Sequence, residues 1–284
     1  MAVVDAALPD ERLTEDEIGT ILFDDPEPTC LFGIPGTGVA AGVLRPHTTS
    51  PNLVHVQVVA VTPDARRRGA GAALLGELHR WAFDDQRVTS VVAGGGAPFY
   101  LWPGIDVNAT GALCMFESLG YDVDRGYLDL TFPSRFRSPV PEGVEVRRVL
   151  CDADADSALA FVAAHWPTWV AECRRGIEHG ACHIAVAASR GDAGDGDGDV
   201  VGFGCHSVNR LGVLGPIGTH PARRDAGVGS AVMSAIATDV MVAGLDEVRV
   251  SWIGPYRFYA KAAGASTARA YLSYVLRRPA APSA

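Results

Sequence analysis

The sequence has 284 residues, of which 48% are hydrophobic and 20% are charged. A chain of this length forms one large domain or two modest ones, and so much apolar material excludes a wholly disordered chain. The formal net charge of −9 argues against a non-specific nucleic-acid binder, because neutralising phosphates requires surplus Lys and Arg.

The sequence shows no export or membrane signal. The N-terminus is acidic without a basic start, and no stretch approaches the about 20 apolar residues of a membrane span. The six cysteines are scattered without a C-x-x-C pair, which argues against metal ligation and a disulfide framework. We expect a cytoplasmic monomer or homodimer with no bound metal, no nucleic-acid partner and no membrane partner.

Apolar periodicity predicts the same order of elements twice. The first half is expected to form strands at 29–34, 39–44 and 53–61, a helix at 70–83, a strand at 88–93, a helix at 112–119 and a strand at 122–132. The second half is expected to form a strand at 144–149, helices at 154–166 and 168–179, strands at 183–188, 200–208 and 211–219, a helix at 227–242, a strand at 247–253, a short helix at 258–263 and a last strand at 270–276. Asp154 and Thr168 are candidate N-caps of the two early helices.

A Pro-rich segment near the middle of the chain separates the repeats. Residues 133–143 carry three prolines and a glycine without any apolar period, which indicates a linker. We therefore predict a first domain at 1–133, a linker at 134–142 and a second domain at 143–284. Mixed strands and helices in this order indicate an α+β (α/β layered) fold, twice over. The acidic run 192–199 is followed by Val200 where a calcium loop needs Gly, and no Glu stands at the twelfth position of such a loop. We therefore expect a hairpin turn there.

The long strand of each half ends in the same basic, Gly-rich loop. The loops read TPDARRRGAG at 62–71 and THPARRDAGVG at 219–229, and both contain R-x-x-G-x-G. Glycines let a phosphate approach the backbone, a helix N-terminus attracts negative charge, and arginines add charge-assisted contacts. Two copies in one context predict a phosphorylated ligand rather than two solvated loops. A P-loop is excluded because G-x-x-x-x-G-K-[ST] is absent, and Leu74 and Val232 replace the third glycine of a dinucleotide fold.

The sequence resembles the GNAT superfamily of acyl-CoA N-acyltransferases. The family pattern V-x-P-x-x-R-x-x-G-x-G occurs as VTPDARRRGAG, and again as THPARRDAGVG with Thr219 in place of Val. A short helix ending in F-Y-x-K-x-G is matched by 258–264 with one residue too many, and loosely by 115–121. The resemblance covers nearly the whole chain and implies two consecutive GNAT-type domains, each a mixed, mostly antiparallel sheet flanked by helices.

The resemblance also implies the ligand contacts. The strand before each loop would bind the pantetheine arm of acetyl-CoA through Val59 and Val61, and through Ile217 and Thr219. The loops would bind the pyrophosphate through Arg66, Arg67, Arg68, Gly69, Ala70, Gly71 and Ala72 in the first half, and through Arg224, Asp225, Ala226, Gly227, Val228, Gly229 and Ser230 in the second.

Catalysis is expected in the second half. Family members often protonate the leaving thiolate with a tyrosine of the short helix, a role that Tyr259 fits, although a buried core tyrosine is the alternative. The matching first-half residue, Phe116, has no proton to give. His206 is the candidate general base, with His165 behind it and a water chain equally open.

These expectations lead to an acetyl-CoA-dependent N-acetyltransferase that acts on a small-molecule amine such as an amino sugar, an aminoglycoside, an amino acid or a polyamine. The alternative is a non-catalytic acyl-CoA-binding or regulatory tandem protein. The aromatic segment 99–104 either shapes an acceptor pocket or plugs the seam between the domains. Trp166, Trp169 and Trp252 either line the second acceptor site or fill the core.

Overall fold

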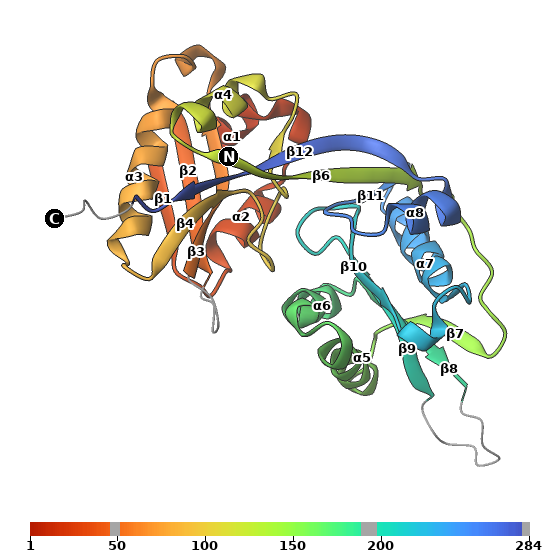
Figure 1. The fold of residues 1–284 in the computed structure, drawn as a ribbon. Coiled ribbons are helices and arrows are strands. Elements are labelled where there is room, and N and C mark those ends of the chain that lie inside the picture. Colours follow the sequence, from red (N-terminus) through yellow and green to blue (C-terminus); the bar gives the residue numbers. More distant parts are fainter. Residues whose placement is uncertain (46–51, 189–197, 280–284) are drawn as a thin grey trace. The chain divides into compact units, whose positions relative to one another are not determined.

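The computed structural model describes residues 1–45, 52–188 and 198–279. Their contacts form two compact units (Figure 1). Unit 1 contains Met1–Leu128 and Arg269–Ala284, and unit 2 contains Asp129–Ala268. The hairpin turn expected at 192–199 lies almost wholly outside the described residues.

Unit 1 is a mixed sheet with helices on both faces. Its strand order is β1-β2-β3-β4-β12, and β3 and β4 are parallel. The strands are β1 (Thr29–Ile34), β2 (Gly38–Arg45), β3 (Asn52–Val61), β4 (Val88–Ala93) and β12 (Ser266–Arg277), with the short β5 (Ile105–Asp106) on β12. Helix α3 (Ala70–Asp84) covers one face, and α1 (Ala2–Ala7) and α2 (Glu15–Phe23) cover the other (Figure 1). Helix α4 (Thr110–Ser118) adds Phe116 to the core beneath α3.

The two N-terminal helices were not expected from the sequence. Helix α2 begins with a capping box, in which Thr14 accepts a hydrogen bond from the Glu17 amide and the Glu17 carboxylate accepts one from the Thr14 amide. The sequence signal was therefore present, because Ser or Thr followed three residues later by Glu marks a helix start.

Unit 2 repeats this architecture. Its strand order is β6-β11-β10-β9-β8-β7, and β10 and β11 are parallel. The strands are the end of β6 (Asp122–Pro133), which enters unit 2 at Asp129, and β7 (Val144–Arg148), β8 (Cys182–Ala187), β9 (Asp199–His206), β10 (Val213–Thr219) and β11 (Glu247–Val250). Helices α5 (Asp152–His165) and α6 (Val170–Glu178) lie on one face, and α7 (Val228–Val242) lies on the other (Figure 1). Helix α8 (Tyr256–Ala263) follows β11 and ends at Gly264, whose φ is +63°.

The apolar stripe predicted on α7 is confirmed, since Val228, Val232, Ile236 and Val240 are all buried. The expected N-caps are wrong. Helix α5 begins after Cys151, and Asp154 pairs with Arg147 instead. Thr168 falls inside the short 3₁₀ turn Pro167–Trp169 that precedes α6.

The two units do not coincide with the two predicted domains, because each unit takes one strand from the other half of the sequence. Residues 274–277 of β12, near the end of the chain, pair with β4 of unit 1. Residues 130–133 of β6 pair with β11 of unit 2. Strand pairing between segments so far apart in the sequence leaves no local pattern from which it could have been predicted.

None of the helices in the described ranges is both long and apolar enough to cross a membrane.

Candidate active site

Each unit contains a pair of parallel strands that separate partway along their length. Strands β3 and β4 pair from Asn52 to Val56, which leaves residues 57–61 of β3 beyond the paired region. Strands β10 and β11 pair only at Val213 and Leu214. The far end of each leading strand can therefore offer backbone groups to an extended ligand, and Val59, Val61, Ile217 and Thr219 all lie in these ends.

The two Gly-rich loops have the same backbone conformation. Arg66 and Arg224 both have φ −64°, with ψ 157° and 153°, and Gly69 and Gly227 have φ 84° and 82°. Between them Arg67 and Asp225 adopt φ 63° and 61°. Positive φ at the glycines explains why the spacing of the motif is retained in both copies.

Each loop presents an uncapped helix N-terminus. No side chain caps α3 at Gly69 or α7 at Gly227. The loop residues before each helix are exposed, including Arg67, Arg68 and Arg224. Open N–H groups, the helix dipole and nearby arginines give each loop the features of a phosphate-binding site.

Arg66 differs from its counterpart in unit 2. Its guanidinium donates to the Val61 carbonyl at 3.1 Å and to the Ala7 carbonyl at 2.8 Å. These bonds turn the side chain back onto the strand and α1, and they occupy a carbonyl that was expected to contact pantetheine. Arg66 therefore ties the loop of unit 1 to β3 and α1.

The second glycine of each motif allows two helices to pack closely. A β-carbon added at Gly71 would lie 2.6 Å from Sδ of Met115 on α4, and one added at Gly229 would lie 3.0 Å from Cζ of Phe258 on α8. Both glycines are buried. Their missing side chain faces the short helix, so they serve helix packing as well as the loop.

Tyr259 follows Phe258 on α8 and is 5% exposed. The two rings meet edge to face, with centroids 5.0 Å apart. Burial raises the pKa of Tyr259 above its usual value of 10, so the phenol keeps its proton at neutral pH. Within the described part of the chain its hydroxyl has no hydrogen-bond partner. In unit 1 the equivalent position holds Phe116, which is packed against Tyr121 in the core.

Residues 94–104 cover the diverging strands of unit 1. The Gln57 amide donates to the Phe99 carbonyl at 3.2 Å, and a β-carbon added at Gly96 would lie 3.0 Å from Cβ of His55. Phe99 and Leu101 are buried in one cluster with residues of α1 and α2. The aromatic segment at 99–102 therefore fills the core of unit 1. In unit 2 the link from β11 to α8 is only residues 251–255.

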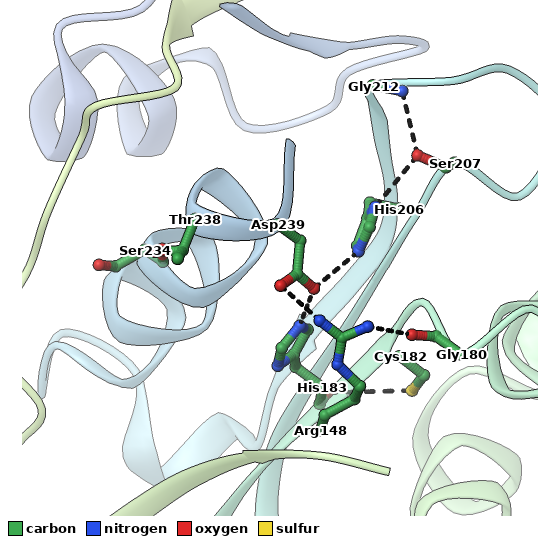
Figure 2. A network of polar contacts seen from close by, with 10 residues as sticks. All are labelled: Arg148, Gly180, Cys182, His183, His206, Ser207, Gly212, Ser234, Thr238 and Asp239. Atoms are coloured by element: carbon green, nitrogen blue, oxygen red, sulfur yellow. Dashed lines mark hydrogen bonds and ion pairs between the residues drawn. The ribbon is translucent and has the colours of Figure 1, made fainter. Parts of the chain in front are cut away.

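His206 belongs to a polar network at the C-terminal end of α7 (Figure 2). Its Nε2 lies 3.1 Å from Asp239 Oδ2 and its Nδ1 lies 3.0 Å from Ser207 Oγ. His183 Nε2 reaches the same carboxylate oxygen at 2.6 Å, and Arg148 Nη2 reaches Oδ1 at 2.5 Å. Both ring nitrogens of His206 are therefore engaged, and the network ties α7 to β7, β8 and β9.

The charges in this network follow from burial. Desolvation lowers the pKa of His183 and of His206 below 6.5, although Asp239 opposes that shift. Burial alone would raise the pKa of Asp239, but His183 and Arg148 lower it below its usual value. At neutral pH the carboxylate is charged and accepts from two neutral imidazoles and one guanidinium.

Two side-chain groups in unit 2 have the residue types of metal ligands. They are Cys173, Cys182 and Cys205 on the α6 side of the sheet, and His183, His206 and Asp239 on the α7 side. Within each group the ligand atoms lie within 4.8 Å of one another. Sequence spacing did not reveal either group, because each is assembled from two strands and a helix.

Sequence reasoning also missed Glu172 on α6, a carboxylate that is only 6% exposed. Its sole sequence signal is a glutamate among the inward-facing positions of an amphipathic helix.

The acetyltransferase (GNAT) family model matches residues 4–97. No curated protein sequence matches significantly. Among solved structures, a tandem GNAT protein from the clavulanic acid biosynthesis pathway has a TM-score of 0.68 at 18% identity, covering 97% of this chain and 94% of its own. A GCN5-related N-acetyltransferase from Sphaerobacter thermophilus has a TM-score of 0.64 at 17% identity, with coverages of 98% and 91%.

A third structure belongs to a longer protein. The glucosamine N-acetyltransferase region of a fungal multi-domain GH3 β-N-acetylglucosaminidase has a TM-score of 0.74 at 17% identity, and the match covers 97% of this chain but only 36% of the fungal chain. The chain thus has the tandem GNAT fold over 97% of its length, and residues 4–97 match the sequence model of the GNAT acetyltransferases.

Proposed function

We propose that the chain is an acetyl-CoA-dependent N-acetyltransferase that moves an acetyl group to the primary amine of a small molecule, with catalysis in unit 2. The observation that carries the proposal is the loop shared by both units, with matching dihedral angles at Arg66 and Arg224 and at Gly69 and Gly227. Each loop follows a strand that diverges from its parallel neighbour, so a phosphate site and an extended backbone edge occur together.

Three differences favour unit 2 as the catalytic unit. Tyr259 is a buried residue whose hydroxyl has no hydrogen-bond partner among the described residues, whereas Phe116 has no hydroxyl. Arg66 occupies the Val61 carbonyl, whereas the guanidinium of Arg224 has no bond to β10 among the described residues. Residues 94–104 cover the diverging strands of unit 1, whereas the equivalent link in unit 2 is short.

The residues of unit 2 would divide the reaction between them. The N-terminal amides of α7 and Arg224 would bind the pyrophosphate, and the backbone of 215–219 would orient the pantetheine arm. The acceptor nitrogen forms a bond to the thioester carbon, and the carbon–sulfur bond breaks with its electron pair on sulfur. Tyr259 would give that sulfur a proton.

Calorimetric titration of acetyl-CoA, followed by steady-state release of CoA over a panel of amines, tests the proposal. We expect one or two sites whose affinity weakens as salt rises, because the pyrophosphate contacts are electrostatic. Absence of both heat and thermal stabilisation at millimolar acetyl-CoA would remove the proposal.

A non-catalytic acyl-CoA-binding protein is the alternative. It is favoured by unit 1, in which Phe116 has no hydroxyl and Arg66 occupies the Val61 carbonyl. Binding of acetyl-CoA without turnover of any amine would support it.

A further inference from the structure

A buried carboxylate on α6 takes part in none of the interactions described above. Glu172 is 6% exposed and shares the inward face of α6 with Cys173, Arg175 and Gly176. Within the described ranges no group donates a hydrogen bond to its carboxylate. Burial removes most of the water around this side chain, so a ligand that donates hydrogen bonds to the carboxylate gains more than it would on the surface.

The neighbours of Glu172 place it on the face of the sheet where β10 leaves β11. One turn earlier, Trp169 stacks on Trp166 with centroids 5.5 Å apart, and Trp166 lies directly over Gly218 of β10. One turn later, Arg175 donates to Asn209 and to the Val208 carbonyl, beyond the end of β9. Trp166 and Arg175 thus contact opposite ends of the segment that includes residues 215–218 of β10, which follow its pairing with β11. Glu172 lies between Trp166 and Arg175 in the sequence.

The chemistry of this group selects one kind of ligand. Indole faces attract cations and apolar surfaces, and a desolvated carboxylate pairs strongly with an ammonium. Arg175, one turn along the same helix face, repels a second positive charge. The group therefore fits a molecule with one ammonium and an apolar body better than a polycation or a sugar.

We propose that Glu172, Trp166 and Trp169 form the acceptor site of unit 2, and that the acceptor is a monoamine with an apolar or aromatic body. This proposal rests on the acetyltransferase function proposed above. Glu172 accepts one proton from the ammonium, and the released lone pair forms the nitrogen–carbon bond. After the carbon–sulfur bond breaks, sulfur is protonated by Tyr259, which recovers its proton from the amide nitrogen, and Glu172 returns its proton to solvent.

The environment of Glu172 suits a proton acceptor near neutral pH. Burial raises its pKa to about 7, although Arg175 opposes that shift. A general base works best when its pKa lies near the working pH.

The test compares phenylethylamine, spermidine and glucosamine as acceptors for the wild-type chain and for Glu172→Gln. Glu178→Gln, an exposed glutamate on the same helix, is the matched control. We expect phenylethylamine to have the highest kcat/KM, and Glu172→Gln to lower it by about 100-fold or more while acetyl-CoA affinity is unchanged. Glu178→Gln should stay within about twofold. Trp169→Leu, which keeps the carboxylate, should raise the KM for phenylethylamine with a smaller change in kcat.

The possible failures separate the two proposals. If the chain binds acetyl-CoA but prefers spermidine or glucosamine, acetylates none of the three, or keeps its activity in Glu172→Gln, the acceptor site is wrong and CoA binding stands. If acetyl-CoA does not bind at all, the proposed function fails, and the acceptor site fails with it.

Discussion

Removing the hydroxyl of Tyr259 should separate catalysis from stability. The ring is buried against Phe258, but in the described ranges its hydroxyl has no hydrogen-bond partner. A typical hydrogen bond contributes about 0.5–1.5 kcal/mol to stability, and here none is lost. Tyr259→Phe should therefore change the free energy of unfolding by less than about 0.5 kcal/mol.

The effect on turnover should be much larger. General acid catalysis is worth about 10²–10⁴-fold, and each factor of ten corresponds to about 1.36 kcal/mol of activation free energy. A CoA thiolate with a pKa near 8.5 is a tolerable leaving group, so the low end applies. We expect kcat to fall about 100-fold, or about 2.7 kcal/mol, with little change in the KM for acetyl-CoA.

Tyr121→Phe is the matched control, because the Tyr121 hydroxyl lies 2.7 Å from Nε2 of His79 in unit 1. Its loss should cost about 1 kcal/mol of stability without changing kcat. The measurements are urea unfolding and the steady-state release of CoA thiol. Unchanged kcat in a well-folded Tyr259→Phe variant would refute the acid role, assign the side chain to core packing and leave solvent as the proton donor.

Gly229→Val should abolish turnover, because its β-carbon would lie 3.0 Å from Phe258 and displace the helix that carries Tyr259. Gly71→Val would meet the flexible side chain of Met115 and should leave kcat largely intact, as measured by steady-state release of CoA thiol. Arg224→Ala should weaken acetyl-CoA binding about fivefold and reduce its salt dependence by calorimetry; Arg66→Ala should instead lower the melting temperature, because its guanidinium bonds carbonyls of unit 1. Asp239→Asn should lower the stability of unit 2 by about 1–3 kcal/mol in urea unfolding, since Arg148 and His183 lose their charged partner; an unchanged midpoint would contradict this role. Burial lowers the pKa of His183 and of His206, so below pH 6.5 the unfolded chain binds protons that the folded chain does not. The stability that these residues contribute above pH 6.5 should therefore be lost as the pH falls. Thermal melts from pH 8 to 5 test whether the melting temperature falls in this direction.

The parts of the fold that the sequence predicted are those governed by local rules. Apolar periods located most of the helices and every strand except the two-residue β5, and the stripe from Val228 to Val240 is buried as expected. The R-x-x-G-x-G repeat identified two loops that share one backbone conformation, because Gly69 and Gly227 allow a positive φ that other residues rarely adopt. The N-terminal helices were missed although the capping box at Thr14 and Glu17 was readable.

Only the tertiary structure decided which side chains have partners. The sequence offers His206 as a base through its position on a strand, but the carboxylate of Asp239, 33 residues later, is hydrogen-bonded to its ring. Glu172 was not singled out, since its burial depends on the packing of α6 over β8 and β9. The assignment of β12 to unit 1 likewise depends on its pairing with β4, and that of the end of β6 to unit 2 depends on its pairing with β11. Hydrophobic period and backbone conformation are properties of a few neighbouring residues, whereas desolvation and hydrogen bonding depend on segments that meet only when the chain has folded.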